Sequence, residues 1–336
     1  MNTGSERDLK RRLKAIGLSE GAIAAAWPQW WSDDADASPS ARLELHFSIA
    51  RKLGIDPRSL LDAEGTPRFI WRDEARFKHL SGESDAERAA ISSFGRALGA
   101  LLIGGTTQLI DPANADAASL RGLVLENQPF VRLNDLLSIC WSTGTPVIHL
   151  RVFPRQQKRM AAMAVRVTGR GAILLAKDAS YPAHIAFYLA HELGHLLLGH
   201  LDREAAIVDL ESMHVGSKDD REEDEADRFA LELLTGTPDP HVVPMNRSYN
   251  APALAAAVRD AGPKLRVEPG TLALCFGFST QNWPVVNAAM RFIYERPKPV
   301  WKEVNAVALR ELDFARIPED AHAFLGSVLG ADEHAR

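Results

Sequence analysis

Two histidines four residues apart, with a glutamate after the first, offer the clearest chemistry in this sequence. His191, Glu192 and His195 lie in PAHIAFYLAHELGHLLLGH, where Pro182 suits the first turn of a helix. On a helix, two such histidines project from one face and can ligate one Zn²⁺. Glu192 lies beside that face, where a carboxylate can take a proton from a polarised water and pass it to a leaving amine. Gly194 leaves room for close packing over the metal. The motif alone leaves open a helix whose histidines bind no metal.

A second predicted helix, over residues 219–234 (DDREEDEADRFALELL), offers a third ligand. Its acidic first turns suit the helix dipole. Glu223 is expected to reach the metal. Asp227, one turn later, is expected to accept the other ring N–H of a ligand histidine and so fix its tautomer. Glu222 and Glu225 are interpreted as solvated charges.

Other polar side chains near the motif are weaker candidates for a role in catalysis. His184, Tyr188 and His214 are candidates for donating a hydrogen bond to an oxyanion, with ordinary surface or core packing as the alternative. The metzincin pattern HExxHxxGxxH requires glycine at position 198 and histidine at position 201. Gly199 and His200 each stand one position away, which excludes that pattern. We expect His200 to interact with the helix dipole at the C-terminal end.

HELGHLLLGH followed by EDEADRFALELL resembles the ImmA/IrrE family of intracellular metallopeptidases, in which HELGH precedes an E-x-E-A-N-x-F-A-x-x-L-L helix. The ligand pattern is also similar to that of thermolysin-type gluzincins. The resemblance covers roughly residues 120–285. Asp227 stands where the family usually has asparagine and keeps the acceptor. Thr235 and Gly236 replace a frequent Met-Pro pair, which alters the expected edge of the substrate cleft.

The resemblance implies a zinc-dependent endopeptidase with one Zn²⁺ per chain, ligated by His191, His195 and Glu223, with Glu192 as general base. It also implies an intracellular protein substrate. The suggested substrate is a helix-turn-helix transcriptional repressor encoded nearby, cleaved in a stress response or in the regulation of a mobile element.

The predicted fold class is α+β and mostly helical, with a helical N-terminal module followed by a zincin-like metallopeptidase domain with a small sheet. Strands are expected within residues 145–152, 164–168 and 172–176, the last two joined by a turn at Gly169. The expected division is a helical module at 1–65, a linker and helices at 66–120, the peptidase domain at 121–285 and a helical C-terminal extension at 286–336.

The N-terminal segment SARLELHFSIARKLGIDPRSLL resembles the last two helices of phage-repressor-type helix-turn-helix domains. Where the recognition helix should stand, however, the chain has WPQWW and then DDADASPS. Residues 1–80 carry thirteen Lys and Arg against twelve Asp and Glu, which gives little electrostatic attraction to DNA. A degenerate module used for protein contacts or dimerisation is therefore favoured over DNA binding.

The composition argues against a nucleic-acid-binding protein, a disulfide-stabilised secreted protein and a membrane-spanning protein. The formal net charge of −5 lacks the basic character of most nucleic-acid-binding proteins. Two cysteines, Cys140 and Cys275, indicate a reducing compartment, and Cys140 is expected to pack in the core instead of occupying the zinc's open position. The N-terminus lacks the apolar stretch of a signal peptide and no apolar run could span a bilayer, so we expect a cytoplasmic protein without a membrane partner.

Two other functions remain open on the sequence. The protein could be a regulator that binds DNA or a protein through its N-terminal helices, with a vestigial or structural metal site. It could also be an antitoxin-like component of a complex.

Overall fold

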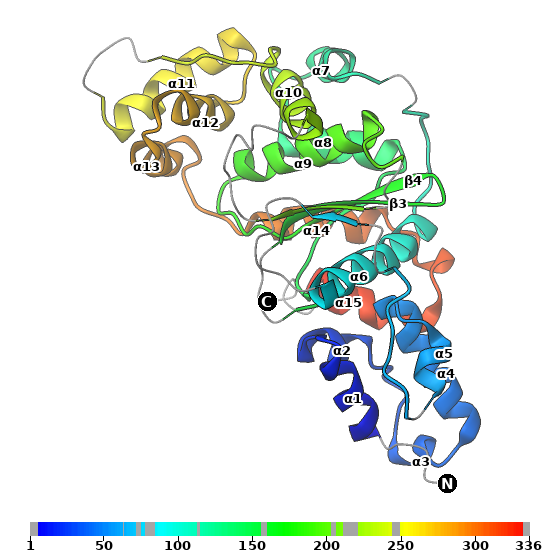
Figure 1. The fold of residues 1–336 in the computed structure, drawn as a ribbon. Helices are drawn as coiled ribbons and strands as arrows, with labels where there is room; N and C mark the ends of the chain where they lie inside the picture. Colours follow the sequence, from blue (N-terminus) through cyan, green and yellow to red (C-terminus); the bar gives the residue numbers. More distant parts are fainter. Residues whose placement is uncertain are drawn as a thin grey trace.

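A mixed five-stranded sheet with helices on both faces forms the centre of the protein (Figure 1). The structure is a computed structural model that describes residues 6–62, 64–71, 75–77, 85–112, 115–155, 160–202, 206–210, 221–243 and 249–331. The strands are β1 (Ala75–Phe77), β2 (Val147–His149), β3 (Met160–Val167), β4 (Arg170–Leu175) and β5 (Ala206–Leu210), in the order β1-β5-β3-β4-β2. β3 pairs antiparallel with β4 and β5, whereas β2 joins β4 and β1 joins β5 in parallel.

Two of these strands differ from the sequence-based expectation. β1 lies in the segment expected to contain a linker and helices, and β5 lies between the two motif helices, where no strand was expected. Ala206, Ile207 and Val208 of β5 are all buried, so the strand lacks the alternation of a half-exposed strand. Its parallel partner β1 is remote in sequence, so no local turn signal marks the pair.

Most of the remaining described residues are helical, as predicted. No helix among the described residues is long and apolar enough to cross a membrane. The N-terminal helices are α1 (Glu6–Ala15), α2 (Glu20–Ala26), α3 (Asp33–Asp36), α4 (Pro39–Leu53) and α5 (Pro57–Leu61). The central helices are α6 (Asp85–Gly104), α7 (Ala117–Leu125), α8 (Leu133–Ser142), α9 (Pro182–Leu197) and α10 (Arg221–Thr235). The C-terminal helices are α11 (Ala251–Leu265), α12 (Pro269–Thr280), α13 (Trp283–Ile293), α14 (Val300–Glu311) and α15 (His322–Leu329), with short 3₁₀ helices η1 (Phe314–Arg316) and η2 (Glu319–Ala321).

Helices α6 and α9 cover opposite faces of the sheet (Figure 1). A Cβ atom at Gly95 would come within 2.4 Å of Met163 Sδ, and one at Gly99 within 2.6 Å of Val165 Cγ2. Since these β3 residues alternate along the strand, they face α6, while Ala164 between them packs with Leu196 of α9. The two glycines therefore allow α6 to lie directly on the sheet.

The N-terminal helices and the last helix share the hydrophobic core of the sheet. Leu13 and Ile49 from the N-terminal helices belong to the same buried cluster as Phe324 and Leu325 of α15. α15 contacts α2 and lies near α6 in the ribbon view (Figure 1). Between α2 and α4, where a recognition helix would be expected, the chain forms only the four-residue α3.

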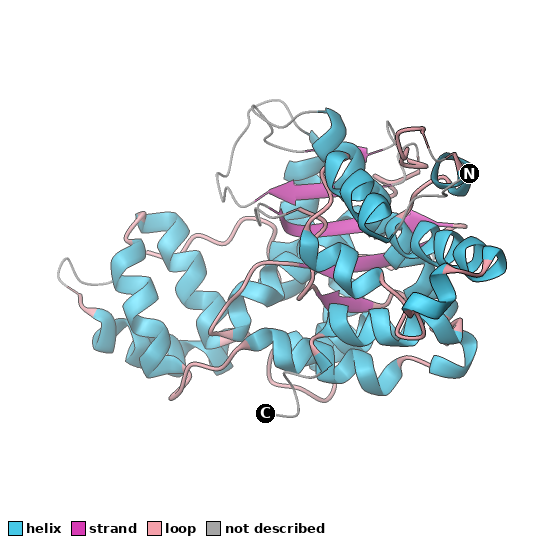
Figure 2. Ribbon diagram, turned by 90° about the horizontal axis from the view of Figure 1, so that it is seen from below, coloured by secondary structure: helices cyan, strands magenta, loops and turns pink. Residues whose placement is uncertain are grey.

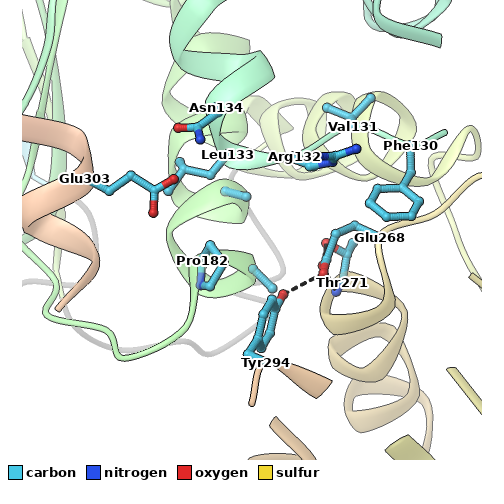
Figure 3. A pocket seen from close by; sticks show the side chains of 12 residues that line it. Phe130, Val131, Arg132, Leu133, Asn134, Pro182, Glu268, Thr271, Tyr294 and Glu303 are labelled. Carbon is cyan, nitrogen blue, oxygen red and sulfur yellow. Dashed lines mark hydrogen bonds between the residues drawn. The ribbon is translucent and has the colours of Figure 1, made fainter. Parts of the chain in front are cut away.

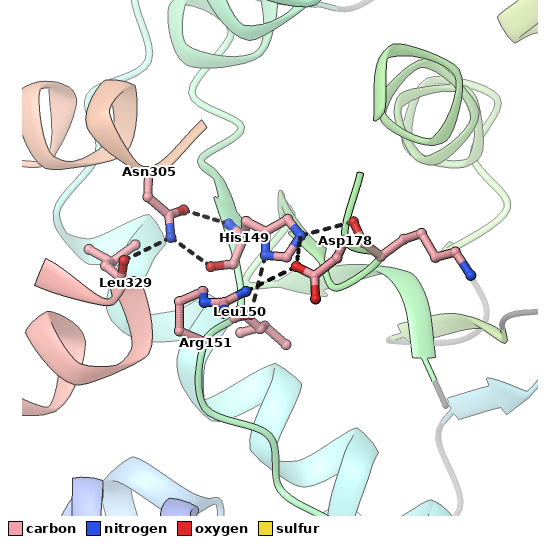
Figure 4. A network of polar contacts seen from close by, with 7 residues as sticks. His149, Leu150, Arg151, Asp178, Asn305 and Leu329 are labelled. Carbon is pink, nitrogen blue, oxygen red and sulfur yellow. Dashed lines mark hydrogen bonds and ion pairs between the residues drawn. The ribbon is translucent and has the colours of Figure 1, made fainter. Parts of the chain in front are cut away.

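A buried asparagine joins the C-terminal helices to the sheet (Figure 4). Asn305 of α14 accepts a hydrogen bond from the His149 backbone N–H at 2.7 Å through Oδ1. Its Nδ2 donates to the His149 carbonyl at 2.7 Å and to the Leu329 carbonyl at 2.9 Å. One side chain thus ties β2, α14 and the end of α15 together.

Helices α11, α12 and α13 form a second hydrophobic cluster, to one side of the sheet in both ribbon views (Figures 1 and 2). Ala183 in the first turn of α9 belongs to this cluster. Tyr181, just before α9, stacks on Tyr294, just after α13, with ring centroids 5.5 Å apart. The N-terminal end of α9 therefore lies where the two clusters meet.

Candidate metal centre

Helices α9 and α10 pack closely against each other, which brings their polar residues together. A Cβ atom at Gly194 of α9 would lie 3.1 Å from Phe229 Cδ1 of α10, which is tight packing. Ala226 and Ala230 of α10 are fully buried. Small side chains on both helices therefore permit this approach, and Phe229 covers the glycine between the two motif histidines.

His191, His195 and Glu223 direct their ligating atoms at one point. The Nε2 atoms of the two histidines are 3.0 Å apart. Glu223 places Oε1 3.0 Å from His195 Nε2 and Oε2 3.5 Å from His191 Nε2. In a tetrahedral zinc site with bonds near 2.0–2.1 Å, ligand atoms are about 3.3 Å from each other. Two imidazoles and a carboxylate at these separations fit a metal ion of this kind.

The electrostatics of Glu223 also suit a ligand. Burial raises the pKa of this carboxyl group, but its contacts with His191 and His195 outweigh that effect and hold the pKa well below its usual range. The group is therefore a carboxylate, the form that binds metal. Glu192, between the two histidines on α9, is 0% exposed.

Asp227 contacts the ring of His191 on the side away from the cluster. Its Oδ1 lies 2.8 Å from His191 Nδ1. A ring that donates Nδ1–H to this carboxylate presents its Nε2 lone pair to the cluster. The structure therefore brings His191, His195, Glu223 and Asp227 together, with Glu192 on the same helix as the histidines.

His200 and Glu225 make contacts that the sequence did not indicate. His200 was predicted to interact with the helix dipole and Glu225 to be solvated, and the Glu225 side chain is 37% exposed. In addition, His200 Nδ1 lies 2.8 Å from His195 Nδ1, and its Nε2 lies 3.2 Å from Glu225 Oε2. Gly199 has a φ of +76°, a left-handed conformation that glycine adopts readily and that turns the chain back toward His195. A Gly-His pair directly after the helix is the sequence signal that could have indicated this contact.

Two of the three candidate oxyanion donors lie in the described part of the chain. His184 and Tyr188 line a small apolar pocket between α9, α10 and α12, and burial lowers the pKa of His184. Phe187 also lines this pocket, and its ring centroid is 6.2 Å from that of His191. His214 lies outside the described residues.

Cys140 is buried in α8, as predicted. Burial raises the pKa of its thiol to about 12. The side chain therefore remains a thiol packed in the core, since burial disfavours the thiolate that would bind a metal.

A cavity of about 430 Å³ opens at the N-terminal end of α9 (Figure 3). Pro182 and Ala186 of α9 form part of its wall, opposite Glu268 and Tyr294. The Tyr294 hydroxyl donates a hydrogen bond to Glu268 Oε1 at 2.7 Å. No sequence motif marks this cavity, because its walls come from the starts of α8, α9 and α12, from Tyr294 and from Glu303 of α14.

Comparison with known proteins supports a peptidase. Residues 146–258 match the Peptidase_M78 family, whose model is described as the IrrE N-terminal-like domain. The match includes α9 and α10 and thus every residue of the metal-ligand cluster. Neither a search of curated proteins nor one of solved structures found a match. The segment that carries His191, His195 and Glu223 therefore resembles the IrrE N-terminal-like domain of the Peptidase_M78 family.

Proposed function

We propose that the protein is a zinc-dependent endopeptidase that hydrolyses a peptide bond in an intracellular protein. The observation that carries this proposal is the convergence of His191, His195 and Glu223, whose ligating atoms all lie within 4.8 Å of one another. Glu192 adds a buried carboxylate between the two histidines. The family match of residues 146–258 supports a metal-dependent peptidase independently of this geometry.

In this proposal His191, His195 and Glu223 hold one Zn²⁺ per chain. When bound, the ion supplies Lewis-acid polarisation of the scissile carbonyl and of the attacking water. Glu192 takes the proton from that water and passes it to the leaving amine, so one carboxylate acts first as base and then as acid. Asp227 holds His191 in the tautomer that presents Nε2 to the ion.

The proposed substrate is a transcriptional repressor with a helix-turn-helix domain, encoded near this protein. The family resemblance suggests this class of substrate. The helical N-terminal residues, which resemble part of such a domain, are suited to docking a protein of the same type. Cleavage of the repressor would switch on genes in a stress response or on a mobile element.

The decisive test combines metal content with cleavage. Wild-type protein and the variants Glu192→Gln, His195→Ala and His241→Ala are purified, analysed for bound zinc and incubated with the candidate repressor. His241 is an exposed residue outside the cluster and serves as the control. Wild type and His241→Ala are expected to bind zinc and cut at one site. Glu192→Gln should bind zinc without cutting, and His195→Ala should do neither.

Two results would count against the proposal. A wild-type protein that contains no metal and binds none after incubation with Zn²⁺ would exclude the metal centre. Cleavage that persists in Glu192→Gln would exclude this carboxylate as the general base.

A further inference from the structure

We propose that His200 is a positioning residue that fixes the tautomer and the orientation of His195, and that Glu225 and Arg221 hold His200 in place. This inference rests on the proposed metal site, because it assigns His195 Nε2 to the ion. It adds three residues to that site, all of them outside the HExxH motif.

The contacts form a continuous chain from the cluster to the protein surface. His195 Nδ1 and His200 Nδ1 are 2.8 Å apart, which requires one nitrogen to donate and the other to accept. His200 Nε2 lies 3.2 Å from Glu225 Oε2. Arg221 Nε donates to Glu225 Oε1 at 2.6 Å, one helical turn away. The side chains of His195 and His200 are 0% and 5% exposed, which shields the inner contacts from water.

The direction of each hydrogen bond follows from the outer end of this chain. The Glu225 carboxylate can only accept, so His200 must donate through Nε2–H. A neutral imidazole with hydrogen on Nε2 has a lone pair on Nδ1, which accepts from His195 Nδ1–H. With its hydrogen on Nδ1, His195 presents the Nε2 lone pair toward His191 and Glu223. One arrangement of protons thus satisfies every contact.

The two histidines of the cluster are therefore supported in different ways. His191 donates directly to the carboxylate of Asp227 at 2.8 Å. His195 donates to a neutral imidazole, with the Glu225 carboxylate one ring farther away. Each arrangement fixes a tautomer, but the second keeps the negative charge of its carboxylate away from the ligand ring.

The local backbone explains why His200 can reach His195. Helix α9 ends at Leu197, and Gly199 then turns the chain in the left-handed conformation. The His200 backbone N–H donates to the His195 carbonyl at 3.1 Å. This bond holds His200 next to the last turn of the helix. The centroids of the His195 and His200 rings are 5.0 Å apart.

The first experiment measures the dissociation constant for zinc by competition with a chelating dye. His200→Ala should weaken binding by about 10- to 100-fold, as is usual when the partner of a ligand histidine is removed. His200→Asn places Oδ1 near the former Nδ1 position and should recover most of that affinity, because it restores an acceptor. His241→Ala, an exposed histidine outside the chain of contacts, should bind zinc like wild type.

The second experiment needs no substitution. Nitrogen-15 NMR of zinc-loaded wild-type protein distinguishes a protonated ring nitrogen from one with a lone pair. His200 should have its hydrogen on Nε2, and His195 should have its hydrogen on Nδ1. A purely structural role for His200 would not require this pair of tautomers.

The outcomes separate this inference from the proposed function. If the wild-type protein binds no zinc, the proposed function fails and this inference fails with it. If wild type binds zinc but His200→Ala binds it equally well, only the positioning role is excluded. A His200 ring with its hydrogen on Nδ1 would also exclude that role. Weaker binding in His200→Ala, recovery in His200→Asn and the expected tautomers support it together.

Discussion

Replacing Asn305 with leucine tests whether the C-terminal helices are an integral part of the folded core. The side chain is 0% exposed and makes three hydrogen bonds, two to His149 and one to Leu329. Each bond contributes about 1 kcal/mol net, and a buried N–H or C=O that loses its partner costs about 1–3 kcal/mol. Leucine has the same branching pattern as asparagine but is bulkier, so the change removes the polar contacts without opening a cavity and adds some overpacking.

We therefore expect Asn305→Leu to lower the free energy of unfolding by about 3–6 kcal/mol, a large part of the 5–15 kcal/mol of a typical protein. Urea denaturation followed by tryptophan fluorescence measures this change, and Trp301 on the same helix is a buried reporter with the Arg151 guanidinium 4.5 Å from its ring centroid. Arg310→Ala, at an exposed position of α14, is the control and should change the value by less than about 0.5 kcal/mol. A loss below about 1 kcal/mol in Asn305→Leu would refute the calculation, because a single lost hydrogen bond would explain it.

Two further predictions concern titratable groups. Burial raises the pKa of Asp320, but its contacts with Arg51 and Ser48 lower the pKa by a larger amount. The net effect is a pKa below the usual value. Asp320→Asn should therefore reduce stability at neutral pH. The difference is present above the unfolded-state pKa of about 3.9 and should disappear as pH falls through the lowered folded-state pKa; urea denaturation over this range tests it, and a pH-independent difference would contradict it. Burial raises the thiol pKa values of Cys140 and Cys275 to about 12. An alkylating reagent at mildly alkaline pH should therefore label both cysteines in urea and neither in the folded protein. Mass spectrometry measures this labelling. Rapid labelling of the folded protein would contradict this burial.

Local sequence signals were sufficient for most helices and for the motif itself. The positions of His191 and His195 on one face follow from helical periodicity, which links residues three and four apart. The same rule places Glu223 and Asp227 on one face of α10. Gly54, which ends α4 in the left-handed conformation, is an example of a local signal for a helix end.

Interactions between distant segments could not be predicted in this way. β1 and β5 are short strands that become stable only when they pair with each other and with β3. The segment 286–336 was predicted only as a helical extension, yet Asn305 forms a hydrogen bond with a residue 156 positions away. No local pattern encodes such a bond, because it depends on how α14 packs against the sheet.

The sequence by itself determined which groups are available for a metal site, since His191 and His195 on one helix, and Glu223 and Asp227 on another, are each four residues apart and lie on one helix face. Only the tertiary structure decided that these helices meet, through Gly194 packed against Phe229, and that His200 and Glu225 lie behind His195. The physical reason is that helical hydrogen bonds span four residues, whereas the approach of α9 to α10 depends on side-chain packing between separate segments.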